Sequence, residues 1–495
     1  MADKDTKFAG YFGIKFGSNG RMRSFAYKVD EEATVDWATS PSSEKDSEKR
    51  KPRDQETEAK DQREDLEILM ERFSDTIMSY YSLIEISSQV PLIFTYAFLE
   101  HNVVNPIKNN ATCLKEGDGW KVFGLNERES AELAKSNLKL RRMKQGTSAL
   151  PASTLMSLVA AFDSMIADLV LVLLKDKKEK LHIGEKSVPI SDILQASSID
   201  DIVNKFVSDQ VYELLRGSHD DQVGFIEKTF DIKIRKYWGA WSSFIEIFER
   251  RNLLAHGESH FTQRYRNICD RHGKSEFICS VGDQIDLNEE YLLHSADTLL
   301  EFLLLVTFSL WRKHFDEQEE LAFSALNNSA FKLIVEGRSN TANSLLEFGL
   351  SLTNVRCSEI VRRMMIINRA NALKKMGETE ESLKVLDSVE WGAAADNFRI
   401  CEAAVRDDVD AVVAKMDVVS RSGAMIADDF RDWPVFDAIR ENIKFQSEFE
   451  KVFSEPLLAP AQRSDVDTET DSDDSGADGE TKNEPEAQPK SDAIH

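Results

Sequence analysis

The stretch that decides the fold is the apolar run at residues 155–174, LMSLVAAFDSMIADLVLVLL. Asp163 and Asp168 are its only charged residues, and it has no proline or glycine, so it predicts one long buried helix. Residues 288–314 predict a second long apolar helix. Such helices bury their surfaces against other helices, which predicts a bundle. Each aspartate either lines a site or, more often, faces solvent or pairs with an arginine.

Helical periodicity continues on both sides of this run. From Arg63 onward, apolar residues recur every three or four positions, until Pro91 is expected to kink or end the helix. We expect further helices at 128–145, 199–216, 220–231 and 236–256, and irregular chain at 101–127 and 265–286. Residues 5–30 instead alternate apolar and polar side chains around Ser18-Asn19-Gly20, which predicts a β-hairpin.

The C-terminal part shows an internal repeat. The segment 367–391, INRANALKKMGETEESLKVLDSVEW, resembles one tetratricopeptide repeat, with Gly377 at the turn between its two helices. Gly337 lies forty residues earlier, in a weaker copy, and a third weak copy follows. We therefore predict two or three degenerate helical hairpins, which commonly stack to present a concave binding face.

The predicted fold is mostly α-helical. It comprises a helical bundle followed by helical-hairpin repeats, with a small N-terminal β-hairpin and a disordered acidic tail. We divide the chain into a β-hairpin segment at 1–37, a charged linker at 38–62, a helical segment at 63–127 that packs on the bundle, a helical domain at 128–317, repeats at 318–453 and the tail at 454–495.

Composition restricts the class of protein. The chain has 495 residues, a net charge of −25 and five scattered cysteines, so a protein that coats nucleic acid is disfavoured and a reducing compartment is expected. The start, MADKDTKFAG, lacks the apolar stretch of a secretory signal. The most apolar stretches, Glu85 to Glu100 and Glu301 to Arg312, fall short of the roughly 18 apolar residues of a membrane helix. We expect buried helices there, no membrane contact and a cytoplasmic protein.

The segment 248–257, FERRNLLAHG, carries the candidate chemistry. Gly257 is a natural helix end, and the negative end of the helix dipole favours a protonated His256. Asn252 lies four residues before His256 and shares its face, whereas Arg251 lies roughly 140° around the helix. An arginine, an amide and a histidine together suit a phosphodiester, since they supply charge neutralisation, hydrogen bonding and proton transfer without a metal.

This pattern resembles the signature of the HEPN family, which is an arginine, four to six residues and a histidine. The resemblance covers about residues 150–315. It implies a helical bundle that dimerises and cleaves RNA without a metal or cofactor, using the 2′-hydroxyl as nucleophile. Arg251 would then stabilise the phosphorane, Asn252 would position the site, and His256 would act as general acid or base. The auxiliary candidates are Glu249, Arg250, which also satisfies the spacing, and His260.

The resemblance predicts an endoribonuclease that acts as a homodimer or higher even oligomer on an RNA substrate, as a toxin in stress response or antiviral defence against phage. One alternative is a non-catalytic adaptor that dimerises and binds a protein partner on its repeats. A second is a regulatory nucleotide-binding protein that uses the same cationic pocket. In the plainest interpretation, the two arginines are surface charges and His256 only caps the helix.

A zinc site is a further alternative. The possible ligands are His256, His260, Cys269, His272 and Cys279. Their spacing matches no standard zinc finger, and Gly257 separates the first two histidines. We therefore expect no metal, and we expect both cysteines to be buried as small apolar residues.

Overall fold

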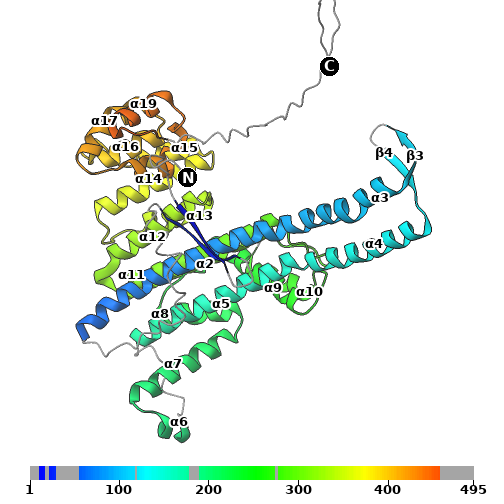
Figure 1. Ribbon diagram of the computed structural model, residues 1–495. Helices are drawn as coiled ribbons and strands as arrows, with labels where there is room; N and C mark the ends of the chain where they lie inside the picture. The colour runs from blue at the N-terminus through cyan, green and yellow to red at the C-terminus, as the bar shows by residue number, and fades with distance from the viewer. Residues whose placement is uncertain are drawn as a thin grey trace, which may run out of the picture. The chain divides into compact units, whose positions relative to one another are not determined.

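The computed structural model describes residues 11–16, 22–28, 55–117, 120–177, 189–273 and 277–457 (Figure 1). These residues are mostly helical, which confirms the predicted fold class at that level. The chain divides into two compact units, of which one comprises residues 1–38 and 458–495 and the other residues 39–457. The acidic tail beyond residue 457 and residues 38–54 of the predicted linker lie outside the described residues.

In the first unit, the described part is an antiparallel hairpin of β1 (Tyr11–Phe16) and β2 (Met22–Lys28). Phe12 pairs with Tyr27 and Ile14 with Phe25, so the alternating residues of the sequence face one another across the hairpin. The pairing register shifts between Lys15 and Phe16. The predicted two-stranded sheet is confirmed, while its turn at Ser18-Asn19-Gly20 lies outside the described residues.

The second unit contains a helical bundle built around the two apolar helices. Ring contacts of Phe162, Phe244 and Phe302 join three helices at the centre, with centroids of Phe244 and Phe302 4.5 Å apart. Both apolar runs are therefore core helices, as the sequence predicted. The principal helices of the bundle are α2 (Gln55–Leu99), α5 (Leu150–Asp176), α9 (Trp241–Ala255) and α11 (Glu289–His314).

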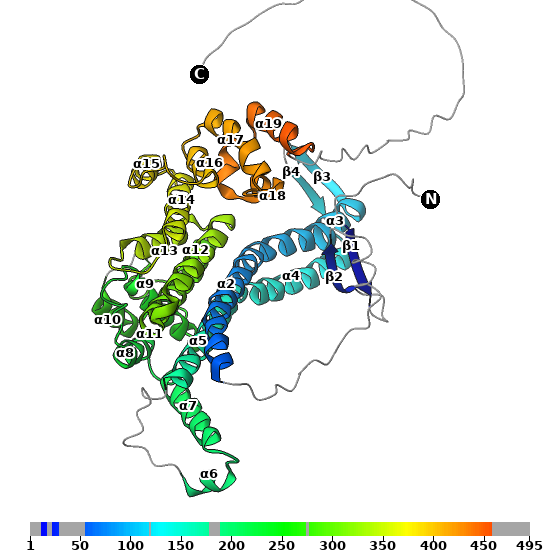
Figure 2. The same ribbon diagram turned by 90° about the vertical axis from the view of Figure 1, so that its left-hand side faces the viewer.

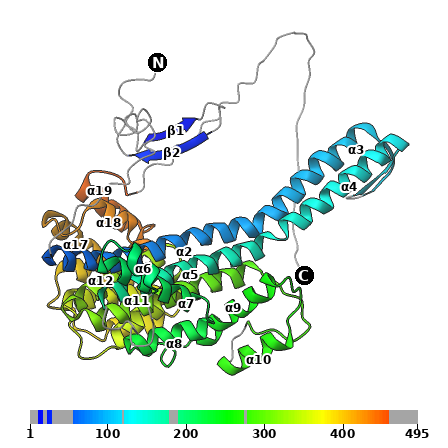
Figure 3. The same ribbon diagram turned by 90° about the horizontal axis from the view of Figure 1, so that it is seen from below.

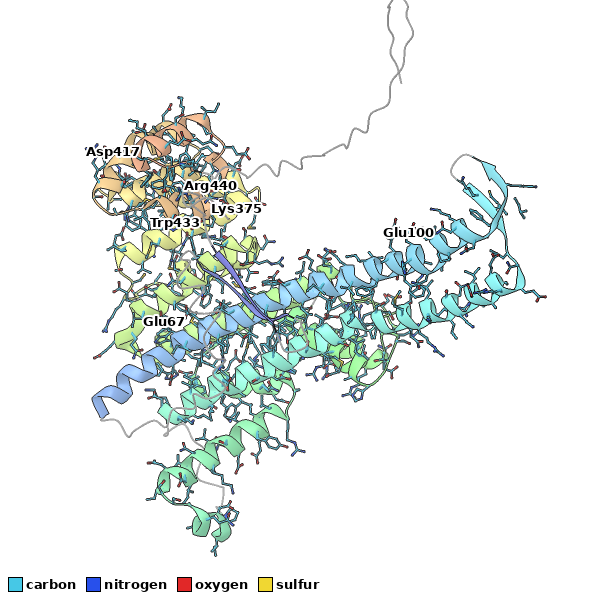
Figure 4. The ribbon with its side chains drawn as sticks, in the orientation of Figure 1. Glu67, Glu100, Lys375, Asp417, Trp433 and Arg440 are labelled. Atoms are coloured by element: carbon cyan, nitrogen blue, oxygen red, sulfur yellow. The ribbon has the colours of Figure 1, made fainter. Side chains whose placement is uncertain are left out.

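The N-terminal half of the bundle extends into a long arm, seen in Figures 1 and 3. Helix α2 runs through Pro91 and continues as a π-helical turn, η1 (Glu100–Val104), and α3 (Asn105–Asn110). A β3–β4 hairpin (Thr112–Gly117 and Trp120–Gly124) then leads into the returning helix α4 (Glu127–Thr147). Figure 4 shows Glu67 at one end of this path and Glu100 well along it.

This arm corrects two predictions. Pro91 does not end its helix, because α2 continues through it to Leu99. Residues 101–127 are helix and β-hairpin rather than irregular chain. The predicted linker also ends earlier than residue 62, because α2 begins at Gln55.

The prediction that no stretch is long and apolar enough for a membrane helix is wrong. Three helical stretches of the described chain are long and apolar enough to cross a membrane, with mean hydropathies of 1.3, 2.1 and 1.4: Asp65–Asn110, Glu127–Asp176 and Glu289–His314. A membrane span tolerates isolated polar residues, so it does not need an uninterrupted apolar run. In the third stretch, 72% of the most apolar 18-residue window is buried inside the protein, but in the first stretch only 11% is. In the first stretch, Leu92 and Tyr96 are 73% and 71% exposed. The stretch from Glu85 to Glu100 is therefore not a buried helix.

Smaller helices complete the bundle. Figure 2 shows α6 and α7 extending away from it. Residues 265–286, expected to be irregular, include most of α10, because the Thr262 side chain caps its first turn and Tyr265 and Cys269 bury one face. These helices are α6 (Ile190–Gln195), α7 (Ile199–Leu215), α8 (His219–Phe230) and α10 (Gln263–His272).

The C-terminal part consists of helical hairpins. Gly337 and Gly377 adopt positive φ angles of 73° and 86° in the turns of the first two. The hairpins are α12 (Glu319–Val335) with α13 (Ser339–Ser351), α14 (Glu359–Lys375) with α15 (Thr379–Leu386), and α16 (Asp396–Val405) with α17 (Val409–Arg421). The helices α18 (Ala427–Asp432), η5 (Pro434–Ile439) and α19 (Ile443–Phe453) follow. One apolar core continues from α2 into α14, and the domain boundary at 317 stays a prediction.

Candidate active site

The candidate site lies at the C-terminal end of α9. The helix ends at Ala255, His256 is the capping residue, and Gly257 takes a φ of +75°. The backbone N–H of Glu258 donates to the Leu253 carbonyl at 3.0 Å, and that of Gly257 donates to Leu254 at 3.0 Å. This is the Schellman arrangement, in which glycine closes a helix. The cap fixes the backbone that carries His256.

The exposed face of this helix end carries three of the predicted residues. His256 is exposed, and Asn252, one turn earlier, is half-buried. The Asn252 amide donates to Oε1 of Glu249 at 3.4 Å. Burial raises the pKa of Glu249, although Arg264 and the Asn252 amide oppose the rise. Glu249 therefore takes up a proton more readily than an ordinary glutamate does. It lies next to Asn252, on the face of α9 that carries His256.

Arg251 points toward helix α5. Its Nη2 lies 3.7 Å from Oδ2 of Asp163, and its side chain is 25% exposed. Its Nε is buried and has no hydrogen-bond partner in the described part of the protein. Among the described residues, no hydrogen bond or ion pair joins Arg251 to His256. Within one chain, the Arg251 guanidinium is therefore held by one long ion pair, and its Nε–H donates to no acceptor among the described residues.

The same aspartate holds a histidine that the sequence analysis did not single out. His219, the first residue of α8, lies with Nε2 2.8 Å from Oδ1 of Asp163. Its ring stacks on Phe248 of α9, with centroids 3.4 Å apart. Burial lowers the pKa of His219, and Asp163 opposes this while Arg251 adds to it. Asp163 therefore joins three helices, and the predicted pairing with an arginine is observed.

Arg250, by contrast, belongs to a buried network. Its Nε donates to Glu246 at 2.8 Å, and its Nη1 and Nη2 donate to the carbonyls of Asp286 and Phe277 at 3.0 and 2.7 Å. Glu246 also accepts from two tyrosine hydroxyls, those of Tyr265 and Tyr291, at 2.6 and 2.9 Å. The Arg250 side chain is 4% exposed, so this auxiliary candidate supports the core and does not face solvent.

The residues of the alternative zinc site are spread apart. His260 is exposed and bonds to Ser259, whereas Cys269 is buried against Phe261 and Tyr265. His272 accepts from the indole N–H of Trp241 at 3.3 Å. Across the described ranges, no three histidine, cysteine, aspartate or glutamate side chains come together as a metal site. His260 stays an auxiliary candidate with no described contact to His256.

Known proteins give no further guide. No protein-family profile matches this chain, and no curated protein or solved structure is detectably similar to it. The likeness to the HEPN family and to tetratricopeptide repeats therefore rests on the residues quoted above, and both stay predictions.

Proposed function

We propose that this protein is a metal-independent endoribonuclease of the HEPN type that acts as a dimer. The observation that carries the proposal is the exposed His256 on a glycine-closed helix end, with a partly exposed Arg251 whose Nε has no partner in the described chain. His256 is open to solvent, and Arg251 is partly so, although its Nε is buried. The proposed setting is the cytoplasm, in stress response or phage defence.

In the proposed reaction, the RNA 2′-hydroxyl attacks the adjacent phosphorus and the 5′-oxygen leaves. Arg251 stabilises the charge that develops on the phosphorane oxygens, and Asn252 positions the phosphate. His256 takes the proton from the 2′-hydroxyl or gives one to the leaving 5′-oxygen, and solvent exchanges the other proton. The products are a 2′,3′-cyclic phosphate and a 5′-hydroxyl, so no water is consumed in this step.

The dimer supplies what one chain lacks. Arg251 and His256 have no contact with each other among the described residues, and in the proposed dimer a second copy of the helix end closes the pocket. The arm offers neighbouring exposed apolar side chains on α2, Leu92, Ile93, Phe94 and Tyr96, that a second copy would cover. Light scattering should give an even-numbered oligomer, and a strict monomer at high concentration would contradict the dimer.

The activity is tested by expressing wild type, Arg251→Ala and His256→Ala and following RNA integrity and host growth. Only wild type should cleave RNA, in the presence of a chelator, and leave 2′,3′-cyclic phosphate ends. Arg421→Ala is a matched control, because its side chain is 79% exposed on α17. Equal RNA integrity with all four proteins, in phage-infected as well as uninfected cells, would overturn the proposal.

A second candidate function is a non-catalytic adaptor. A groove on the helical hairpins, lined by uncharged residues, favours it. In that case the bundle dimerises, the hairpins bind a protein partner, and the end of α9 is a structural cap.

A further inference from the structure

A cavity of about 860 Å³ lies where the connection between α8 and α9 meets the end of α11 and the hairpin of α12 and α13. That volume is within the range of small-molecule sites. Its walls are fixed, because Ile232 and Ile234 of the connection belong to the same apolar core as α11 and α13, and Phe348 and Leu352 pack against that core. The candidate segment 248–257 is not part of the described lining, so this is a second site.

The cavity carries positive charge in an acidic protein. Its described lining has four cationic side chains and two carboxylates, which leaves a charge of +2, whereas the whole chain has −25. A concave surface of one sign attracts ligands of the opposite sign. The cations are Lys233, Arg312, Lys313 and Arg356, and the carboxylates are Asp231 and Glu319.

Both carboxylates are paired with the two cations of α11. Lys313 Nζ donates to Oδ2 of Asp231 at 2.7 Å. Arg312 Nη1 donates to Oε1 of Glu319 at 3.1 Å. The other oxygen of Glu319 accepts from the backbone N–H of Arg356 at 2.9 Å, which anchors the connection before α14 beside the cavity. The two carboxylates therefore neutralise α11 and leave the other two cations uncompensated.

These two cations come from different segments. Lys233 lies between α8 and α9, and Arg356 lies between α13 and α14. Both residues are exposed, and neither side chain makes a hydrogen bond or ion pair with another described residue. An arginine presents a planar fork that binds two oxygens of a phosphate, and a lysine adds a point charge. Together they suit an anion with about two charges.

The lining also offers an aromatic surface. The side chain of Tyr237 is 65% exposed although it lines the cavity, and Phe348 is half-buried there. An exposed aromatic ring is a platform on which a nucleobase or another planar ring stacks. The cavity is also large for inorganic phosphate alone, so the expected ligand has an anionic group and a ring.

We propose that this cavity binds a small phosphate monoester that carries a planar ring, the class that includes the nucleoside monophosphates. A phosphate monoester has about two negative charges near neutral pH, which matches the charge of the lining. The phosphate lies against Lys233 and Arg356, and the ring stacks on Tyr237. The proposal goes beyond the nuclease, because it concerns a different ligand on a different surface.

The first test varies the ligand. Isothermal titration of the full chain with AMP, GMP, CMP and UMP identifies the preferred base. That monophosphate is then compared with its 3′,5′-cyclic form and its nucleoside, which keep the ring but carry about one charge and none. We expect the cyclic form to bind about tenfold more weakly and the nucleoside more weakly still. Equal affinity for the three forms, or no binding of any monophosphate at about 1 mM, would overturn the proposal.

The second test varies the protein. Lys233→Ala and Arg356→Ala should each bind the monophosphate about tenfold more weakly, whereas the control Lys228→Ala, an exposed position on α8, should bind it as wild type does. Tyr237→Ala should weaken binding of the nucleotide but not that of inorganic phosphate. Equal nucleotide affinity in all variants would place the ligand elsewhere and overturn the proposal. Tighter binding of single-stranded RNA than of the monophosphate in this cavity would also overturn it.

A stability measurement separates binding from folding. Because the side chains of Lys233 and Arg356 have no partner in the described chain, the Tm of both alanine variants should stay within about 2 °C of wild type by circular dichroism. A loss of affinity that appears only with a matching loss of Tm would show a structural role instead. None of these results depends on RNA cleavage, so failure of this site and failure of the nuclease are distinguishable.

Discussion

Two consecutive arginines on α9 lie in opposite environments. Arg250 is 4% exposed and donates to a carboxylate and two carbonyls. Arg251 is 25% exposed, holds Asp163 at 3.7 Å and has an Nε without a partner in the described chain. Consecutive residues on a helix point about 100° apart, so a one-residue step separates the core network from the surface of the bundle.

The difference shows how to tell a structural cation from a functional one. A buried guanidinium must satisfy its donors inside the protein, because an unpaired charge there is costly. Burial opposes the charge on Arg250, but Tyr291 and Glu246 outweigh it and leave its pKa raised. A partly exposed guanidinium, held only by one long ion pair, can instead bind a ligand with its exposed part. The motif spacing alone allowed either arginine, and only burial distinguishes them.

The largest expected effect tests the buried side of this comparison. Arg250→Ala leaves Glu246 as a buried carboxylate with only tyrosine hydroxyls, and should lower the free energy of unfolding by about 3–5 kcal/mol. Urea unfolding followed by circular dichroism measures it. Arg251→Ala should lose less than about 1 kcal/mol. Equal losses of unfolding free energy in the two variants would show that Arg250 and Arg251 do not differ in their contribution to the fold.

A smaller effect is expected from Asp163, which positions Arg251. Asp163→Asn keeps an acceptor for His219 but removes the charge opposite the guanidinium. RNA cleavage should fall about tenfold, because Arg251 loses its orientation, while stability changes by about 1 kcal/mol or less. Asp168→Asn is the matched control, since Asp168 lies on the same helix and pairs with Arg72. A similar loss of cleavage in both variants would refute the positioning role.

The smallest effect concerns pH. Because burial lowers the pKa of His219, the unfolded chain binds a proton more readily than the folded one. The stabilising contribution is present above the unfolded value of about 6.5 and is lost as the pH falls below it. Unfolding free energies at pH 8 and pH 5.5 should therefore differ less in His219→Gln than in wild type. The same difference in both would mean that His219 titrates normally.

Much of the fold could be predicted from local patterns. The apolar runs that form α5 and α11, and the glycine that closes α9, carry their signals within a few residues. The arm could not be predicted, because a proline inside a helical pattern predicts a kink or an end, and nothing local to Pro91 indicates that α2 continues to Leu99. Helix α10 was missed because its polar sequence hides the buried pair Tyr265 and Cys269.

Local sequence patterns likewise predicted one part of the candidate site and not the other. The spacing of Asn252 and His256 is local and predicted a shared helix face. The link from Asp163 to His219 spans 56 residues, and no local pattern reports it. The residues of the uncharged groove are scattered over three hairpins, so their convergence depends on how the hairpins stack.

The most direct test measures two properties of one variant. Arg251→Ala is purified beside wild type, and both the urea midpoint and the rate of RNA cleavage in chelator are determined on the same preparations. The proposed role predicts a midpoint close to that of wild type and cleavage reduced at least a hundredfold. An unchanged midpoint with an unchanged cleavage rate would show that this guanidinium does not act on RNA.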